Sequence, residues 1–210
     1  MSVATLPPAL EQSSDEPPEE AWPSWIVPPV DGFTSADLDR LPGLPPHTEL
    51  LNGSLVFVSP QGAWHSLVMF FLRSVLRAAA PEGWRVTHGM TAWLDDRNRP
   101  EPDVIVVAES ATRADKTETF YRPEDIALAI ENVSPESIER DHEVKPPKYA
   151  RAGIKNLWLV ERDGEGAVVY VYALDPLSGE YSLTGKCRDR LKVSVPFDID
   201  IDFGTIDDYR

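Results

Sequence analysis

The sequence predicts an α/β fold, in which a mixed β-sheet is flanked by helices and preceded by an N-terminal hairpin. Three observations lead to this prediction. Short apolar runs of strand character recur from residue 84 onward, two stretches show helical periodicity, and Asn52-Gly53 forms a two-residue turn between strand-like segments. The 210 residues are enough for one domain with a substantial core.

An acidic, proline-rich arm precedes the folded part of the chain. Residues 1–46 contain ten of the twenty prolines, and the proline pairs among them exclude regular helix or a central strand. We therefore expect residues 1–30 to be a disordered or loosely packed arm and residues 31–210 to form a single domain. A short capped helix is expected over 35–41, ended by Pro42 and Gly43.

The core elements are expected in the following order, starting near His47. A hairpin covers 49–58 and a helix covers 63–79, where apolar residues recur at helical spacing. Strands follow over 84–94, 103–108 and 125–133, then a broken helical stretch over 138–152 with Gly153 as its C-cap. Further strands are expected over 156–161, 167–174, 180–184 and 191–195, and an acidic tail closes the chain.

The net charge of −15 argues at first against a nucleic-acid partner. Most of it lies outside the core, because residues 1–45 carry −7 and residues 196–210 carry −4, which leaves −4 for residues 46–195. A core this close to neutral can still present a basic face, although the sequence shows no clear one. Nucleic acid, most naturally DNA, therefore stays open as a partner.

The sequence contains no feature that predicts a membrane or secreted protein. No apolar run approaches the roughly 20 residues that a transmembrane helix needs, and the first residues lack a secretory signal. Cys187 is the only cysteine, so an internal disulfide is excluded. This composition fits a reducing cytoplasm, and we expect a cytoplasmic protein without membrane contact.

Three acidic residues lie in or next to apolar strands, where an ordinary hydrophobic core has no charged side chain. Asp103 opens an apolar strand after a proline, where it could also simply bond its own turn. Glu131 ends the strand 126–131 and shares a face with Ala127 and Ala129, which leaves space beside a charge that needs a partner or a metal. Glu49 is expected opposite Val56 in the hairpin, either at the site or as an edge-strand charge.

Lysine is the fourth component of the candidate site. Lys145 precedes Pro146-Pro147, which suit the first turn of a helix, so we expect Lys145 just before that helix begins. Most lysines are merely solvated, and this one is informative only in combination. Two carboxylates on neighbouring strand ends can hold Mg²⁺ or Mn²⁺, and a nearby lysine can orient water or offset charge on a phosphate.

These residues resemble a known pattern. Pro102-Asp103, then Glu131, then a lysine is similar to the PD-(D/E)xK nuclease pattern, and the chain more narrowly resembles the Uma family of restriction endonucleases. The matching pieces within 47–195 are Glu49-Leu-Leu-Asn-Gly53, Ser59-Pro60 with His65, Pro102-Asp103, Glu131 through Ser134-Pro135, Lys145, and Tyr149 through Ile154 leading into Trp158-Leu-Val160.

The resemblance implies a restriction-endonuclease-like fold and a metal-dependent endonuclease. It implies Asp103 and Glu131 as metal ligands, Lys145 as the catalytic lysine, and Glu49 as a further acidic contributor. The chain departs from the broader pattern at Val133, where a lysine usually stands, so Lys145 has to reach the site from the following helix. Nucleases of this type often act as dimers because two strands need two cuts, and a homodimer is expected.

Other residues and another class of function remain to be weighed. His65 falls on the apolar stripe of the helix 63–79 and is expected to be a core histidine or a support of the site. The aromatic residues of 168–172 are expected to pack in the core rather than bind a base. The alternative function is a non-catalytic interaction protein with the nuclease fold, which the negative charge and the acidic arm favour.

Overall fold

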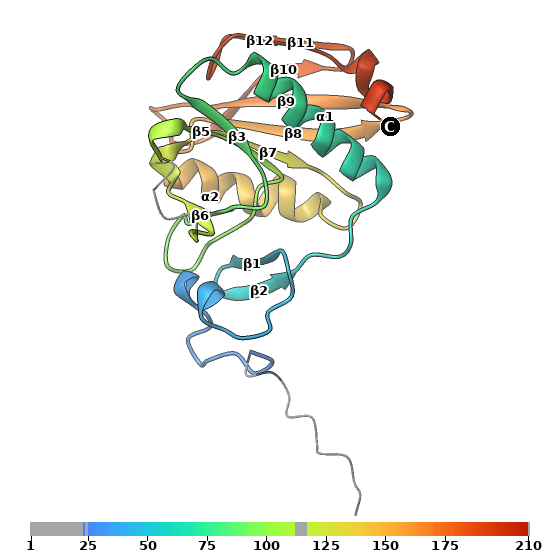
Figure 1. Cartoon of the computed structure of the whole chain (residues 1–210). Coiled ribbons are helices and arrows are strands. Elements are labelled where there is room, and N and C mark those ends of the chain that lie inside the picture. Colours follow the sequence, from blue (N-terminus) through green and yellow to red (C-terminus); the bar gives the residue numbers. More distant parts are fainter. Residues whose placement is uncertain (1–22, 24, 112–116, 210) are drawn as a thin grey trace, which may run out of the picture.

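The structure is a computed structural model that describes residues 23, 25–111 and 117–209. Its centre is a six-stranded sheet with the strand order β10-β9-β8-β7-β5-β3 (Figure 1). The strands are β3 Trp84–Thr87, β5 Val104–Ala108, β7 Ile126–Asn132, β8 Asn156–Asp163, β9 Gly166–Leu174 and β10 Tyr181–Cys187. β7 and β8 run parallel and the other neighbouring pairs run antiparallel, so the sheet is mixed, as predicted.

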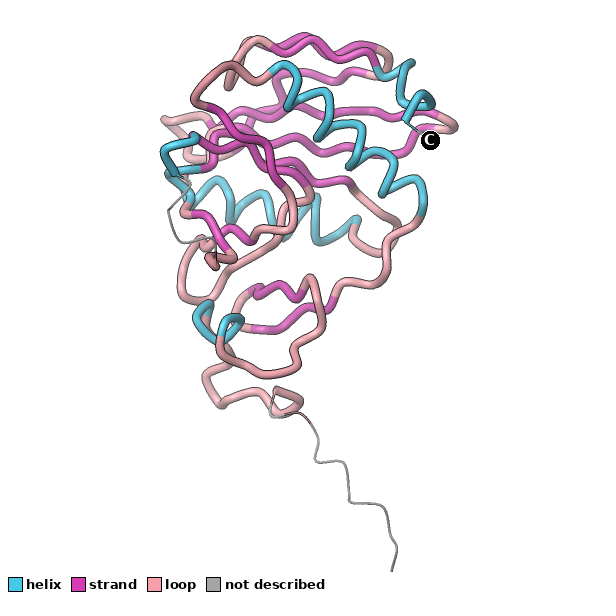
Figure 2. The backbone as a smooth tube through the Cα atoms, in the orientation of Figure 1, coloured by secondary structure: helices cyan, strands magenta, loops and turns pink. Residues whose placement is uncertain are grey.

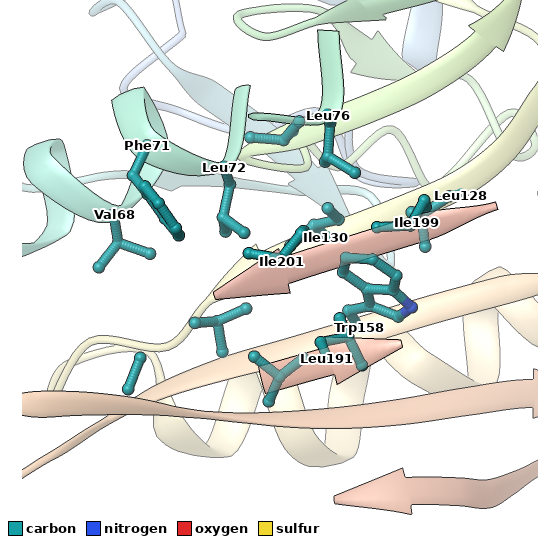
Figure 3. Packing of buried hydrophobic residues seen from close by; sticks show 14 of the residues in the cluster. Val68, Phe71, Leu72, Leu76, Leu128, Ile130, Trp158, Leu191, Ile199 and Ile201 are labelled. Carbon is teal, nitrogen blue, oxygen red and sulfur yellow. The ribbon is translucent and has the colours of Figure 1, made fainter. Parts of the chain in front are cut away.

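The sheet carries one α-helix on each face. α1, Ala63–Ala79, has the predicted bounds and packs its apolar stripe on one face. That core includes Val68, Phe71, Leu72 and Leu76 of α1 with Leu128, Ile130 and Trp158 of the sheet (Figure 3). α2, Lys145–Ala152, covers the other face, where the buried cluster includes Ile105, Ala129, Tyr149, Ile154, Leu157 and Leu159.

The N-terminal hairpin is joined to the body beside the sheet end where the candidate acids lie. β1, Thr48–Leu51, and β2, Ser54–Phe57, turn at Asn52 and Gly53 with φ of 53° and 77°, as a primed two-residue turn requires. The predicted pairing of Glu49 with Val56 is confirmed. Leu50 and Arg99 exchange two backbone hydrogen bonds of 3.1 and 2.7 Å, which hold β1 against the segment that leads to Asp103.

Two segments differ from the sequence prediction. The expected strand over 84–94 is divided into β3 and β4, Thr91–Ala92, because Gly89 between them turns the chain with φ of 65°. β4 then pairs in parallel with β6, Phe120–Tyr121, outside the main sheet. The tail is not simply acidic, since β11, Arg190–Val193, pairs with β12, Ile199–Asp202.

Ile199 and Ile201 are buried in the α1 core while Asp200 and Asp202 point outward. A 3₁₀ helix η5, Phe203–Tyr209, follows and packs on α1 (Figure 2). The remaining short elements are the 3₁₀ helices η1 Ser35–Asp39, η2 Glu109–Ala111 and η3 Pro123–Asp125, and the π-helical turn η4 Arg140–Val144. None of the helices in the described part of the chain is long and apolar enough to cross a bilayer.

Gly153 ends α2 as predicted, and its conformation gives a first testable prediction. Its φ of 86° is left-handed, and a side chain at such a position costs about 1–2 kcal/mol. We expect Gly153→Ala to lower the free energy of unfolding by about that amount, measured by urea unfolding. Gly166→Ala is the matched control, because Gly166 is not left-handed and a Cβ there would make only an ordinary contact, 3.8 Å from Asp163 O; equal losses in both variants would contradict the prediction.

Candidate functional site

Asp103 and Glu131 lie side by side on neighbouring strands. Val104 pairs with Ile130 across β5 and β7, so Asp103, one residue before β5, is opposite Glu131. Opposed residues of an antiparallel pair point to the same face, which here is the face covered by α2. The backbone N–H of Asn132 donates a 2.6 Å hydrogen bond to Asp103 Oδ2, which fixes this carboxylate at the end of β7.

Both oxygens of Glu131 are engaged by side chains of α2. Lys145 Nζ lies 3.0 Å from Oε2, and the Tyr149 hydroxyl donates a 2.5 Å hydrogen bond to Oε1. Glu131 is only 1% exposed, and Tyr149 is fully buried. The space expected above Ala127 and Ala129 is therefore not empty, because α2 with Tyr149 packs on this part of the sheet.

Lys145 is surrounded by carboxylates. Its Nζ lies 2.9 Å from Glu49 Oε1 and 3.3 Å from Asp141 Oδ1, in addition to Glu131. Arg140 approaches the same group, with its Nε 3.5 Å from Glu49 Oε2. Glu49 also accepts a 2.9 Å hydrogen bond from the backbone of Glu101. The site thus joins β1, β7, η4, α2 and the segment before β5 through buried charges.

The electrostatics of this cluster raise the pKa of three of its groups, Glu131, Lys145 and Tyr149. Burial raises the pKa of Glu131 well above its usual value, and repulsion from Asp141, Asp103 and Glu49 adds to that rise while Lys145 opposes it. Burial alone would lower the pKa of Lys145, but attraction to Glu131, Glu49 and Asp141 outweighs it and raises the pKa well above normal. Burial, together with Glu131 and Glu49, also raises the pKa of Tyr149, which stays a phenol.

Asp103 is the candidate that meets the surface directly. Its side chain is 22% exposed and borders a cavity of about 500 Å³ that also touches His65 and Glu101, with His47 and His88 among its lining. His65 Nε2 lies 3.2 Å from Asp103 Oδ1, so this buried histidine supports the aspartate rather than only filling the core. Glu49, Glu131 and Lys145 lie behind Asp103 and do not line this cavity.

A hard divalent cation fits the donors at this site. Mg²⁺ is commonly held by one or two carboxylates and keeps several waters. Asp103 and Glu131 therefore provide the type and number of protein ligands that it needs. Within the described residues no group of three or more His, Cys, Asp or Glu side chains is arranged to hold a metal. The charge balance favours a cation nonetheless, because Lys145 and Arg140 are shared among Glu49, Glu131 and Asp141, and Glu49 Oε2 and Asp141 Oδ1 accept no hydrogen bond among the described residues.

The structure brings together all four residues proposed from the sequence, but it corrects the surroundings of Lys145. This residue was expected just before a helix N-terminus, whereas the π-helical turn η4 runs directly into α2, and the Lys145 N–H donates to the Arg140 carbonyl. Helical register therefore extends upstream of the prolines. It places Asp141, Lys145 and Tyr149 at i, i+4 and i+8 on one buried stripe.

Sequence reasoning missed Asp141, Tyr149 and Arg140 as members of the site, together with Asn132. The helical spacing of Asp141, Lys145 and Tyr149 is a signal for Asp141 and Tyr149, but Pro146 and Pro147 favour a helix that begins after Asp141. Arg140 and the backbone of Asn132 carry no sequence signal of this kind, because their roles depend on tertiary contacts. The bulge in the helix at η4 is a feature often found at functional sites.

Comparison with known proteins identifies the family and the fold of the chain. Residues 35–199 match the family model Uma2, described as "Putative restriction endonuclease". The fold is similar to the crystal structure of a "putative nuclease" of the DUF820 family from Anabaena variabilis, with a TM-score of 0.64 and 18% sequence identity over 84% of this chain and 98% of that one. A search of curated proteins found no match. At this identity the structural likeness concerns the fold alone.

Proposed function

Since the chain belongs to the Uma2 family of restriction endonucleases, we propose that it is a divalent-metal-dependent endonuclease that hydrolyses phosphodiester bonds of DNA. The observation that carries this proposal is the convergence of three separate chain segments: Asp103 and Glu131 share one sheet face, and Lys145 lies 3.0 Å from Glu131. We further propose a cytoplasmic enzyme that acts as a homodimer, because cutting both strands needs two sites.

The proposed roles follow from the contacts. Asp103 and Glu131 would hold Mg²⁺ or Mn²⁺, which when bound polarises a phosphoryl oxygen and lowers the pKa of a bound water. Asp103 is accessible from the cavity and kept in place by His65 and the Asn132 backbone. Use of Glu131 as a ligand requires one of its hydrogen bonds, to Lys145 or to Tyr149, to be exchanged.

Lys145 supplies a permanent positive charge beside the reacting phosphate. Its raised pKa keeps the ammonium charged at neutral pH, because Glu131, Glu49 and Asp141 stabilise the cation against the effect of burial. A charge fixed in a region of low dielectric can stabilise negative charge that develops on the phosphate oxygens. Glu49 and Asp141 also hold this ammonium, at 2.9 and 3.3 Å from its Nζ, so we assign Glu49 a positioning role within the site.

A non-catalytic interaction protein that keeps the nuclease fold is the second candidate function. The observation that favours it is the closed state of Glu131, whose two oxygens are both bonded within the protein. The net charge of −15 also suits protein partners better than DNA. The arm over residues 1–30, which bears on this alternative, lies mostly outside the described residues.

Plasmid nicking tests the enzymatic proposal directly. We expect the purified protein to nick supercoiled DNA in Mg²⁺ or Mn²⁺ and to lose this activity fully in EDTA, because the acids without a cation cannot offset the charge of the phosphate. Restored nicking after Mn²⁺ is added back shows that the loss is reversible. Absence of metal-dependent cleavage on duplex and single-stranded DNA would contradict the proposal.

Metal binding without substrate separates the two candidate functions. We expect isothermal titration to detect Mn²⁺ binding by the wild-type protein, and Asp103→Asn to weaken it by about tenfold or more, because a carboxylate ligand becomes a neutral amide. Asp163→Asn is the matched control, since Asp163 lies at the surface as the last residue of β8, paired with Arg188. If the wild-type protein binds no metal, the interaction protein becomes the better description.

A further inference from the structure

A second cavity lies on the same sheet face as the acid cluster, with α2 as the wall between them. Its volume is about 670 Å³, within the range of about 300–1,000 Å³ that small-ligand sites occupy. Lys145 and Tyr149 of α2 face the acids, whereas Pro147 and Arg151 line the cavity. Leu157 and Leu159 of β8 also line it, together with Tyr172 and Tyr181 of β9 and β10.

The strand register fixes how far this cavity is from the acids. Glu131 pairs with Leu159, Leu159 with Tyr170, and Tyr170 with Lys186, so these four residues form one row across β7, β8, β9 and β10. The next row runs from Ala129 through Leu157 to Tyr172. Because neighbouring strands are about 4.8 Å apart, the tyrosines of β9 lie only about 10 Å from Glu131 along the sheet.

The tyrosines of β9 pack against the core cluster on this face, as expected from the sequence, but they are only partly buried. Tyr170, Tyr172 and Tyr181 are intermediate in burial, and Tyr172 and Tyr181 line the cavity opposite residues of α2. The rings of Tyr172 and Tyr181 are 6.5 Å apart and inclined by 62°, and Tyr181 is fixed by a 2.7 Å hydrogen bond from its hydroxyl to the Ile154 carbonyl. An aromatic surface is thus held open beside the cavity.

Cationic groups accompany these aromatic rings. Arg151 lines the cavity, and Lys186 Nζ lies 4.7 Å from the centre of the Tyr170 ring; His142, which contacts Glu161, and the acid Glu180 also line the cavity. Burial raises the pKa of Tyr172 and of Tyr181, so both hydroxyls are uncharged at neutral pH and do not repel an anion. Flat aromatic surfaces next to arginine and lysine are what unstacked nucleotides bind, through ring stacking and phosphate contact.

We propose that this cavity binds a nucleobase, with its ring against Tyr172 and its phosphate toward Arg151. The inference rests on the proposed function in one respect: the base would belong to an unstacked nucleotide of the DNA whose scissile phosphate lies at Asp103 and Glu131. A free nucleoside monophosphate presents the same chemistry. The shared wall α2 would then connect occupation of the cavity with the position of Lys145.

Binding measured in EDTA tests this inference independently of cleavage. One arm titrates nucleoside 5′-monophosphates by calorimetry, and the other titrates single-stranded oligonucleotides that contain the fluorescent base 2-aminopurine. We expect Tyr172→Leu to weaken binding by about tenfold or more, because leucine fills space but cannot stack, and Tyr172→Phe to retain it. Binding of monophosphates in the first arm identifies a free-nucleotide site; binding of oligonucleotides alone identifies a base of the substrate.

A matched control lies on the opposite side of the sheet. Phe70 of α1 is 56% exposed and lines another cavity of about 650 Å³, so Phe70→Leu removes an exposed ring without touching the proposed site and should leave affinity unchanged. Unchanged affinity of a folded Tyr172→Leu variant would overturn the inference even if the protein cleaves DNA, and so would the absence of any binding in both arms. Tyr172-dependent binding by a protein that never cleaves would instead refute the proposed function alone.

Discussion

Lys145→Met is expected to lower the free energy of unfolding by about 3–5 kcal/mol at neutral pH, the range found when one partner of a buried ion pair is removed. The reason lies in the number of acids that share this single ammonium. Glu49, Glu131 and Asp141 all lie within 3.3 Å of Lys145 Nζ, and each is at most 2% exposed. Methionine fills the space of the lysine stem but leaves three buried carboxylates with only Arg140 nearby.

Urea unfolding of wild type and variant is the measurement, and Lys148→Met is the matched control. Lys148 is half-exposed and less than one turn further along α2, where loss of a lysine should cost under about 1 kcal/mol. The loss in Lys145→Met should shrink at acidic pH, because protonation of the acids removes their need for a cation. A loss below about 1 kcal/mol, equal to that of the control, would contradict the arrangement of charges described above.

The free energy of unfolding at alkaline pH shows whether the charged form of Lys145 stabilises the fold. The pKa of Lys145 is higher in the folded protein than its ordinary value of 10.5, so the folded state holds this proton more tightly than the unfolded chain. The stability that Lys145 contributes is therefore complete below that value and is lost as the pH rises through the folded pKa. The difference between wild type and Lys145→Met should stay constant from neutral pH to about pH 10 and fall above it.

The parts of this molecule that the sequence alone predicts are those whose signals are local. Asn52-Gly53 predicts the hairpin because only a few residues adopt the required positive φ, and the apolar stripe of 63–79 predicts α1 because its period is helical. The face on which Glu131 lies can be predicted from the sequence, because side chains alternate between the two faces along a strand. That Asp103 shares this face with Glu131 follows from the register of β5 and β7.

The parts that escaped prediction depend on contacts between distant segments. Pro146 and Pro147 suggested a helix start, but the preceding turn adopts π-helical geometry and continues the helix, which brings Asp141 into the site. The alternation of Ile199 and Ile201 with aspartates was hidden by the acidic composition of the tail. The partial burial of Tyr172 depends on how α2 and β10 pack around the cavity that it lines, which no local signal in the sequence encodes.

The charge cluster also implies that the site is kept at a cost in stability. Three buried acids, Glu49, Glu131 and Asp141, lie close together beside Asp103, and Lys145 with Arg140 compensates only part of their charge. Sites that require strain or repulsion for their chemistry often show this conflict between stability and activity. A substitution that removes one negative charge without changing the shape of the side chain can therefore separate the effect on activity from the effect on stability.

Glu131→Gln is expected to abolish cleavage while leaving the protein at least as stable as the wild type at pH 8. Loss of a carboxylate that supports the metal should reduce the rate by about a thousandfold, equivalent to several kcal/mol of transition-state stabilisation. Stability should not fall, because Lys145 keeps Glu49 at 2.9 Å and Asp141 at 3.3 Å, and the amide can still bond the Tyr149 hydroxyl. Without metal, we expect a gain of about 1 kcal/mol or more at pH 8.

The sign of this gain follows from the raised pKa of Glu131. The folded protein binds the proton of Glu131 more tightly than the unfolded chain, whose pKa is near 4.5, so ionisation of this group destabilises the fold as the pH rises through that interval. Glutamine does not ionise, and the two proteins should differ least at acidic pH and most above neutrality. Urea unfolding in EDTA from pH 4 to pH 9 measures the difference, and Glu165→Gln, in the exposed turn between β8 and β9, is the control. A Glu131→Gln protein that is less stable than wild type at pH 8, or that still cleaves DNA, would show that this acid serves the fold and not the chemistry.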